Sequence, residues 1–378
     1  MNILHVIRDL DSNTGGPVSA VFSISSMLAS RGDAVTILSI SLGKYDAPSL
    51  NNVEIVTVPC QFIKWRYSHA FKRVAEKLIE KSDLVHIHTV WEYPTFITAK
   101  LCDIIDKPYI LRPCGMLDEW CMGQGGGLKK LYYKFMTKNI IKKSGGIHFT
   151  SKKEMDLSKK YLHGKYGFVL PIPINECLYS KREKTIKISC MKKKLLFVGR
   201  IHPHKRLELI FQVLGILKSR GITFVLDIAG EGKELYKNSL KDLSVNMGID
   251  NCIDWKGRIK QKNLVTLYRQ AYLTLLPSMH ENYGNVLIEA MSQACPVVMT
   301  REVQISNEVV ESGSGIIVDS NKKSFADTLE CLMKDSNQRN VMAKNSIEYV
   351  HNFLSADNIY PKFKNIYSSL IKSPMDEK

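Results

Sequence analysis

The sequence predicts an α/β protein with two doubly wound domains, each built around a parallel sheet. Short apolar runs of strand length alternate with stretches of helical periodicity along the whole chain, which is the pattern of βαβ units. The alternation is interrupted over residues 171–193, where Pro and Lys are frequent and no period is visible. The length of 378 residues also exceeds what one core usually holds.

The expected elements form two series. The first has strands at residues 2–7, 34–40, 53–58, 83–90, 108–113, 146–151 and 167–172, and helices at 17–31, 69–81, 94–106, 128–143 and 152–162. The second has strands at 193–200, 223–230, 252–257, 273–278, 296–300 and 315–319, and helices at 206–220, 233–247, 261–270, 285–294 and 322–350. They predict an N-terminal domain at 1–170, a linker at 171–193, a C-terminal domain at 194–353, and a last helix at 354–378 that packs back on the N-terminal domain.

The composition is that of a globular protein, with 44% hydrophobic and 24% charged residues. No apolar run approaches the length of a transmembrane helix, and the first residues resemble a strand rather than a signal peptide. The nine cysteines include no C-x-x-C pair, which argues against a disulfide framework or a zinc site. These features predict a cytoplasmic protein.

The net charge of +16 favours anionic partners, and much of it lies between Gly127 and Lys165. This segment holds eleven lysines against Glu154 and Asp156. Residues 128–143 interleave lysines with Leu, Tyr, Phe, Met and Ile at near-helical spacing. Such a helix suits an anionic membrane surface, but it equally suits a helix whose apolar side faces the core.

Ligands of open α/β sheets bind beyond the carboxyl ends of the strands, so the residues that follow each strand matter most. Gly15, Gly16 and Pro17 follow the first strand and open a helix, whose N–H groups could bind an anion or a sugar hydroxyl. Arg200 ends the first strand of the second series and Lys205 follows it. An Arg fork beside a Lys point charge is suited to phosphate.

The stretch HENYGNVLIEA, residues 280–290, carries two glutamates, Glu281 and Glu289. A continuous helix would separate them by about 12 Å along its axis. A hydrolytic carboxylate pair lies closer, at roughly 5–9.5 Å. The spacing therefore favours the two ends of an elongated ligand such as a nucleotide sugar. The N–H groups of Gly284, Asn285 and Val286 would point at its diphosphate.

This stretch resembles the E-x7-E motif of the retaining GT-B glycosyltransferases of family 4. The segments FVGRIHPHKRLELIF, LDIAGEGKEL, DWKGRI, LYRQAYLTLLPS and IEAMSQACPVVMT resemble the same family in order and spacing, over roughly residues 194–320. The segments GGP, VHIHTVW and RPCGMLDEW resemble its O-antigen and exopolysaccharide members. The resemblance implies the GT-B fold, two Rossmann-like domains that face a central cleft.

The resemblance also implies roles for individual residues. Arg200 and Lys205 would hold the diphosphate and stabilise its leaving charge, and Glu281 would contact the donor hexose. Glu289 would bind the ribose, and Gly15 and Gly16 would lie against the donor phosphate and the acceptor. The remaining donor-binding residues, which would hold the base largely through backbone groups, are Gly257, Arg258 and Ile259.

The acceptor side is less defined by the sequence. His88, Trp91, Cys114 and Asp118 follow strands of the first series and are candidates to face the acceptor. Many relatives carry a histidine where this chain has Cys114, so a histidine role there is in doubt. The Asp9-Leu10-Asp11 pattern looks like a D-x-D metal motif, but we interpret it as loop chemistry. His86 and His88 share a strand face without further ligands, so no metal site is predicted.

The function that these features predict is retaining, metal-independent transfer of a hexose from a UDP- or GDP-linked sugar to a saccharide acceptor. We expect a lipid-linked oligosaccharide of O-antigen, capsule or exopolysaccharide, reached by a protein that binds the inner face of the cytoplasmic membrane. The alternatives are a transferase with a small soluble acceptor and a nucleotide-sugar 2-epimerase. A nucleic-acid-binding protein is disfavoured because no recognition motif accompanies the positive charge.

Overall fold

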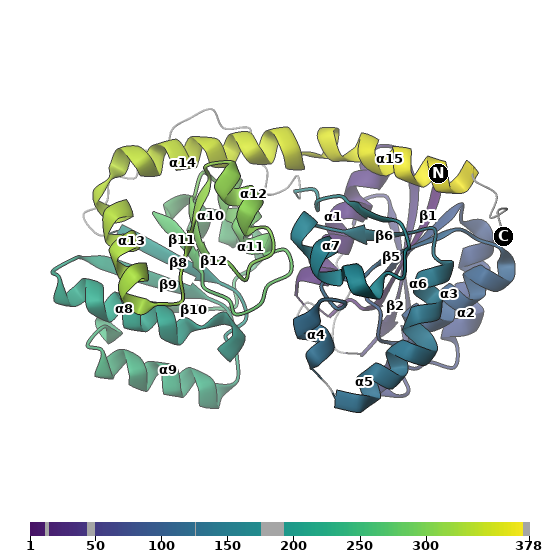
Figure 1. The fold of residues 1–378 in the computed structure, drawn as a ribbon, viewed down its shortest axis with the longest axis horizontal. Coiled ribbons are helices and arrows are strands. Elements are labelled where there is room, and N and C mark those ends of the chain that lie inside the picture. The colour runs from purple at the N-terminus through teal and green to yellow at the C-terminus, as the bar shows by residue number, and fades with distance from the viewer. Residues whose placement is uncertain (12–14, 44–49, 125, 175–192, 373–378) are drawn as a thin grey trace. The chain divides into compact units, whose positions relative to one another are not determined.

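The computed structural model describes the chain except residues 12–14, 44–49, 125, 175–192 and 373–378 (Figure 1). The chain divides into two compact units. Unit 1 comprises Met1–Asn175 and Ala356–Lys378, and unit 2 comprises Glu176–Ser355. Most of the predicted linker 171–193 lies outside the described residues.

Unit 1 is built on a seven-stranded sheet of order β3-β2-β1-β4-β5-β6-β7, with every neighbouring pair parallel. The strands are β1 (Asn2–Asp9), β2 (Ala34–Ser41), β3 (Val53–Pro59), β4 (Leu84–His88), β5 (Tyr109–Arg112), β6 (Gly146–Phe149) and β7 (Gly167–Val169). Because the order reverses beside the first strand, β1 and β4 flank the switch point at which open α/β sheets bind ligands.

The helices of unit 1 connect these parallel strands, as crossover connections require. They are α1 (Gly16–Ser30), η2 (Ile63–Trp65), α2 (Phe71–Lys81), α3 (Tyr93–Ile105), α4 (Glu119–Gly123), α5 (Gly126–Tyr132), η3 (Tyr133–Thr137), α6 (Lys138–Lys143), α7 (Lys152–Ser158), η4 (Lys159–Tyr161) and α15 (Ala356–Lys372). The helix α15 lies on unit 1, where Ile359, Phe363 and Tyr367 are fully buried with residues of α1 and β4.

Unit 2 repeats the plan with a six-stranded sheet of order β10-β9-β8-β11-β12-β13, again all parallel. The strands are β8 (Lys193–Val198), β9 (Phe224–Ala229), β10 (Ile253–Gly257), β11 (Leu273–Leu276), β12 (Val297–Thr300) and β13 (Gly315–Val318). The helices are η5 (Pro203–Lys205), α8 (Leu207–Ser219), α9 (Glu234–Asn246), η6 (Asp250–Cys252), α10 (Gln261–Gln270), α11 (Asn285–Met291), α12 (Ser306–Glu311), α13 (Lys322–Lys334), α14 (Ser336–Tyr349) and η7 (Val350–Leu354). The switch point of this sheet lies between β8 and β11.

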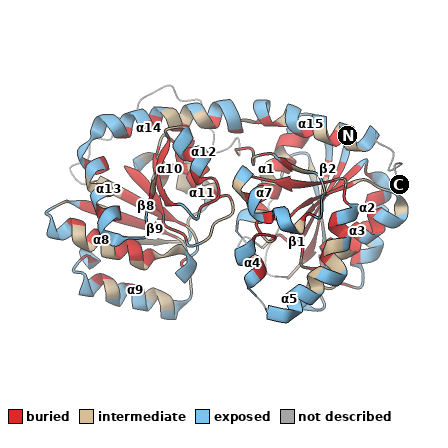
Figure 2. Ribbon diagram, viewed as in Figure 1, coloured by how far each residue is buried: buried red, intermediate tan, exposed pale blue. Residues whose placement is uncertain are grey.

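The inner strands of both sheets are largely buried, as expected of parallel sheets covered on both faces, whereas the edge strands β3 and β10 are more accessible (Figure 2). In β11 and β12 all residues are buried, and α8 contributes seven buried residues to the same core. Among the described residues, no helix is long and apolar enough to cross a membrane.

Both series of strands appear where the sequence predicts them, but the helices differ in places. The single helix predicted at 322–350 is wrong, because α13 and α14 are separated at Asp335. The carboxylate of Asp335 accepts a hydrogen bond from the Gln338 N–H and so begins a new helix. The predicted helix 128–143 continues through a π-helical turn at η3. The short helices α4 and α12 were not predicted, since five or six residues carry too little periodicity.

Candidate donor site and the switch point of unit 1

Closely packed glycine turns form the carboxyl edge of the unit 2 sheet. A Cβ atom on Gly230 would lie 1.8 Å from the carbonyl oxygen of Gly199, and one on Gly232 would lie 2.2 Å from that of Ile201. Only glycine allows the turns after β8 and β9 to approach so closely. The glycines of this stretch, AGEGKEL, had no role assigned from the sequence, although a G-x-G pattern directly after a strand could have indicated a close turn.

Lys205 and Glu281 meet beside this edge. Lys205 ends η5, which follows β8, and Glu281 follows β11, so the two residues come from the strands that flank the switch point. The Nζ atom of Lys205 contacts Oε2 of Glu281, and both side chains remain partly accessible. The structure therefore brings together two residues that the sequence analysis assigned to the donor.

The backbone of Glu281 is held by the segment that follows β12. The N–H of Gln304 donates to the carbonyl of Glu281 over 3.0 Å, and the N–H of Glu281 donates to the carbonyl of Glu302. Glu281 lies before α11, which begins at Asn285, so the stretch between the two glutamates is not one continuous helix. Gly284 adopts the left-handed conformation at the N-cap of α11, with φ of 72°. Asn285 and Val286 form the first turn and are partly accessible.

Further positive charge gathers after β8. Burial lowers the pKa of His202, and nearby His204, Arg200, Lys233 and Lys205 lower it further. Arg200 itself is exposed. Arg200 and Lys205 follow β8 and Lys233 follows β9, so these cations lie at the carboxyl edge of the sheet at which Lys205 and Glu281 meet. Lys233 was not assigned to the site from the sequence, although its position after β9 could have indicated it.

Glu289 lies in the middle of α11, where the hydroxyl of Tyr268 donates a hydrogen bond to its Oε2 over 2.9 Å. The apolar surroundings raise the pKa of Glu289 to about 7, although the bond from Tyr268 acts in the opposite direction. Tyr268, on α10, is almost completely buried. The carboxylate is therefore fixed by a rigid partner that the sequence analysis did not identify.

Gly257, Arg258 and Ile259 lie at the end of β10 and beyond it. The carbonyl of Gly257 accepts from the N–H of Gly230 over 2.8 Å, which joins this turn to the glycine turn after β9. Gly257 has φ of 63°. Arg258 is exposed and Ile259 is half-buried. The predicted base-binding turn is therefore part of the same sheet edge.

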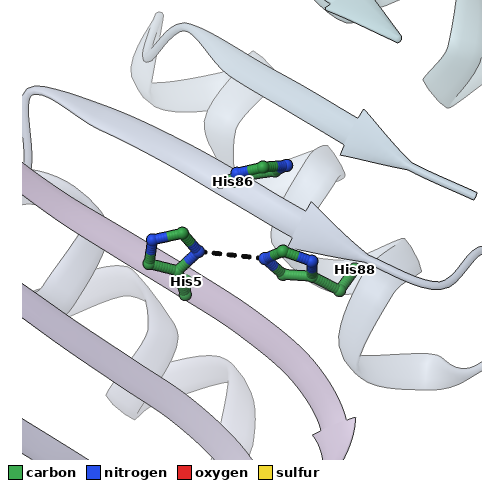
Figure 3. Close-up of side chains that lie close together, drawn as sticks. All are labelled: His5, His86 and His88. Atoms are coloured by element: carbon green, nitrogen blue, oxygen red, sulfur yellow. Dashed lines mark hydrogen bonds between the residues drawn. The ribbon is translucent and has the colours of Figure 1, made fainter. Parts of the chain in front are cut away.

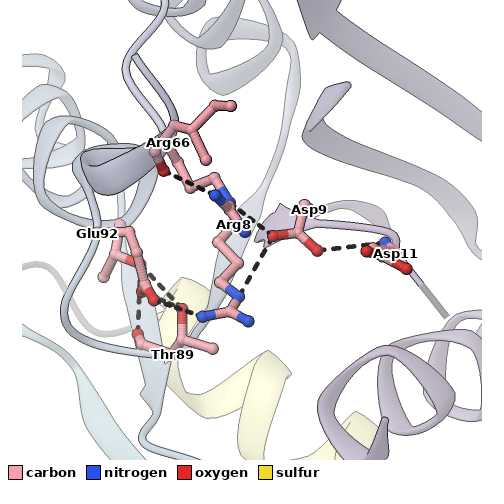
Figure 4. A network of polar contacts seen from close by, with 8 residues as sticks. Arg8, Asp9, Asp11, Arg66, Thr89 and Glu92 are labelled. Atoms are coloured by element: carbon pink, nitrogen blue, oxygen red, sulfur yellow. Dashed lines mark hydrogen bonds and ion pairs between the residues drawn. The ribbon is translucent and has the colours of Figure 1, made fainter. Parts of the chain in front are cut away.

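In unit 1, the residues at the switch point form a charged network (Figure 4). The Asp9 carboxylate accepts from Arg66 Nε over 2.8 Å, and Glu92 accepts from Arg8 over 2.9 Å and from Thr89 over 3.1 Å. Asp9 is therefore held by arginine side chains.

Gly15 and Gly16 begin α1 at the same end of the unit 1 sheet. Gly15 is the N-cap with φ of 79°, and its carbonyl accepts from Val18 N–H, as expected of a βα turn that begins a helix. Both glycines are exposed.

The four acceptor candidates have different surroundings. His88 is fully buried at the end of β4. Asp118 is 1% exposed, and its carboxylate caps α4 by accepting from the Cys121 N–H. Trp91 is partly accessible, with the Lys129 ammonium 4.8 Å from its ring centre. Cys114 is partly accessible and adopts a left-handed conformation with φ of 58°.

His88 belongs to a buried group that the sequence analysis only half identified. His5 on β1 and His86 and His88 on β4 each present a ring nitrogen within 4.8 Å of the others (Figure 3). The expectation that His86 and His88 lack a further histidine was wrong, because His5 comes from the neighbouring strand. Both nitrogens of His86 already have partners, however, in Tyr367 and His148.

Comparisons with known proteins agree with this geometry. Residues 181–349 match the family model described as glycosyl transferases group 1. The D-inositol 3-phosphate glycosyltransferase of Corynebacterium efficiens is 26% identical over 48% of this chain, and the match spans only 44% of that relative. An uncharacterised glycosyltransferase of Methanocaldococcus jannaschii is 23% identical over 93% of this chain and 94% of its own length.

A third relative is the GDP-mannose:cellobiosyl-diphosphopolyprenol alpha-mannosyltransferase of Komagataeibacter xylinus, 20% identical over 84% of this chain and 80% of its own length. Among solved structures, Anabaena HepE in complex with UDP superimposes with a TM-score of 0.77 at 14% identity, over 98% of this chain and 100% of that chain. The fold is GT-B, and the matches support a GT-B glycosyltransferase.

Proposed function

We propose that this protein is a retaining glycosyltransferase that moves a hexose from a nucleotide-diphosphate sugar to a saccharide acceptor. The observation that carries the proposal is the contact of Lys205 with Glu281 at the switch point of unit 2. The contact joins a cation suited to bind phosphate with a carboxylate suited to accept hydrogen bonds from sugar hydroxyls. A bound donor would take over both groups, the diphosphate at Lys205 and the hexose at Glu281.

The remaining residues extend this donor site along the sheet edge. Glu289 would bind the ribose, because Tyr268 occupies only Oε2 and leaves Oε1 to accept from the diol. Gly257, Arg258 and Ile259 would hold the base. The N–H groups of Gly284, Asn285 and Val286, and the turn of Gly15 and Gly16, stay predictions as further diphosphate contacts.

The chemistry follows from the charges. As the glycosidic bond breaks, negative charge develops on the departing diphosphate, and fixed cations lower that barrier electrostatically. Arg200 and Lys205 would supply this stabilisation, with Lys233 beside them. The leaving phosphate would then deprotonate the acceptor hydroxyl on the same face of the sugar. On this proposal the reaction retains the anomeric configuration and needs no divalent metal.

The donor site can be tested by thermal unfolding with UDP, GDP and their sugars in EDTA. We expect one nucleotide to raise the unfolding temperature. Glu289→Ala should weaken nucleotide binding about tenfold or more, since it removes the hydrogen-bond acceptor proposed for the ribose. Glu281→Ala should abolish transfer with a modest loss of nucleotide binding. The matched control is Glu311→Ala, an exposed glutamate at the end of α12. Full transfer activity in both Glu281→Ala and Glu289→Ala would refute the assignment of these two residues to the donor site.

A lipid-linked acceptor at the inner face of the cytoplasmic membrane is the second part of the proposal. Leu128, Leu131 and Phe135 are 78%, 53% and 67% exposed, and their spacing places them on one side of α5 and η3. Tyr133 of η3 and Ile140 and Ile141 of α6 pack in the core instead, so the segment has a second apolar side that faces inward. An exposed apolar row with neighbouring lysines suits an anionic bilayer surface. The diphosphopolyprenol named for the Komagataeibacter relative supports the same acceptor class.

The lysines of this segment are not equivalent. Lys129 donates to the Cys121 carbonyl and Lys143 pairs with Asp103, whereas Lys130 and Lys134 are exposed. Replacing Lys130 and Lys134 with Gln should reduce binding to anionic vesicles and make the remaining binding less sensitive to salt. Leu131→Ser should reduce binding as well, whereas Leu157→Ser, at an exposed leucine of α7, should not. Unchanged vesicle binding in the lysine variants would refute the membrane role of this segment, and failure of the wild-type protein to bind anionic vesicles would favour a small soluble acceptor.

A further inference from the structure

The side chain of Arg112 is a buried cation without a hydrogen-bond acceptor among the described residues. It lies at the carboxyl end of β5 and is only 2% exposed. Its Nε and Nη1 atoms are enclosed and have no partner in the described part of the chain. A buried guanidinium in this state is costly unless an anion compensates it, because desolvation removes several kcal/mol of hydration.

The histidines around Arg112 are neutral. Burial, together with the charge of Arg112, lowers the pKa of His5 and of His148 to about 3. Burial also lowers the pKa values of His86 and His88 well below their ordinary range. At neutral pH, Arg112 therefore holds the one formal charge among Arg112 and these four histidines.

The histidine pair adds an unpaired donor in either tautomer. Nδ1 of His5 and Nε2 of His88 lie 2.9 Å apart and share one hydrogen bond, while His5 Nε2 and His88 Nδ1 are enclosed without partners in the described residues. If His5 donates, the proton of His88 lies on its free Nδ1. If His88 donates, the proton of His5 lies on its free Nε2. In either tautomer, one imidazole N–H therefore lacks an acceptor among the described residues, as the Nε and Nη1 groups of Arg112 do.

Arg112 and His88 lie at the carboxyl ends of their strands, the end of an open α/β sheet at which ligands bind. His88 ends β4 and is paired in register with Arg112. The N–H of Thr89 donates to the Arg112 carbonyl over 2.9 Å, and the thiol of Cys114 contacts the same carbonyl. Cys114 is partly accessible, so the buried cation lies next to surface at the ligand-binding end of the sheet.

We propose that Arg112, with His88 beside it, forms an anion-binding site that takes a phosphate oxygen of the acceptor. This inference rests on the proposed function, since it assigns the site to the acceptor of that reaction. A planar guanidinium with two unpaired nitrogens matches an oxyanion, and phosphate is the anion that lipid-linked and phosphorylated saccharides share.

A divalent metal ion fits the same residues less well. Three histidines without a carboxylate would have to hold it beside a buried Arg cation, and His86 has no nitrogen left for it. The like charges of Arg112 and a metal ion would repel each other in a poorly solvated interior.

The test is a titration of the full-length protein with inorganic phosphate at constant ionic strength, followed by the arginine Nε–H signals in NMR. We expect one signal, identified by its loss in Arg112→Lys, to shift saturably. Phosphate affinity should fall at least tenfold in Arg112→Lys, because the two-pronged contact is lost. Arg73→Lys, at an exposed position of α2, should leave the affinity unchanged.

Each result decides the proposal. No saturable shift of the Arg112 signal, or equal phosphate affinity in Arg112→Lys, overturns it. Binding of zinc alone at submicromolar concentration, lost in His5→Gln, would also overturn it in favour of a cation site. If Arg112→Lys does not fold, the Arg112 signal is identified as the one that persists in every variant of another arginine, and its response to phosphate still decides. Nucleotide stabilisation measured on the same samples reports on unit 2, so failure of the anion site is distinguishable from failure of the donor site.

Discussion

The environment of Glu289 predicts how the stability of unit 2 depends on pH. Its pKa rises from 4.5 to about 7 because the surroundings disfavour the charged form. This difference corresponds to about 3 kcal/mol of unfolding free energy. Because the side chain keeps some accessibility, we expect about 2 kcal/mol to be measured. Glu289→Gln removes the ionisation and leaves a side chain of the same size.

The sign follows from proton binding. Between pH 4.5 and about 7 the folded protein holds a proton at Glu289 that the unfolded chain has released. The stabilisation is thus complete below pH 4.5 and is lost as the pH rises through about 7. Wild-type unit 2 should therefore lose stability over this range relative to Glu289→Gln.

The assay is hydrogen exchange of the β11 amides in both proteins at pH 5 and pH 8. Comparing the two proteins at each pH cancels the intrinsic exchange rates. From pH 5 to pH 8, the protection of the variant should rise about 30-fold relative to wild type, the factor that 2 kcal/mol implies. Tyr268→Phe should enlarge the pH dependence, because it removes the bond that stabilises the carboxylate. A ratio that is constant with pH would refute the reasoning.

Two further predictions concern the two sheets. Gly230→Ala should destabilise unit 2 by about 3 kcal/mol or more in urea unfolding, because the added methyl group would overlap the Gly199 carbonyl oxygen. Gly127→Ala is the control and should be neutral, because its methyl group would meet nothing within 4 Å. Because His5 and His148 are buried and neutral, unit 1 should lose stability as the pH falls from 6.5 towards 3, by about 2–3 kcal/mol per histidine at pH 4.5. His148→Gln should weaken this acid dependence in urea unfolding, and an unchanged dependence would contradict it.

Much of the donor edge could be predicted from the sequence because its residues follow strands directly. Parallel strands end at one edge of the sheet, so Lys205 after β8 and Glu281 after β11 were expected near each other before their contact was seen. Periodicity likewise predicted both strand series. It failed at Asp335, where one side-chain cap divides a continuous pattern into two helices.

The class of fold could be read from the sequence alone, because strands and helices that alternate along a chain have few arrangements in which to bury their apolar faces. The sequence also shows which of the turns after strands contain charged residues or glycines. Only the tertiary structure decided that Tyr268 holds Glu289 and that His5 completes the group with His86 and His88. It also decided that Arg112 is buried without an acceptor among the described residues. The physical reason is that such groups draw on different strands and helices, and a pKa or an unpaired donor depends on neighbours that chain order does not specify.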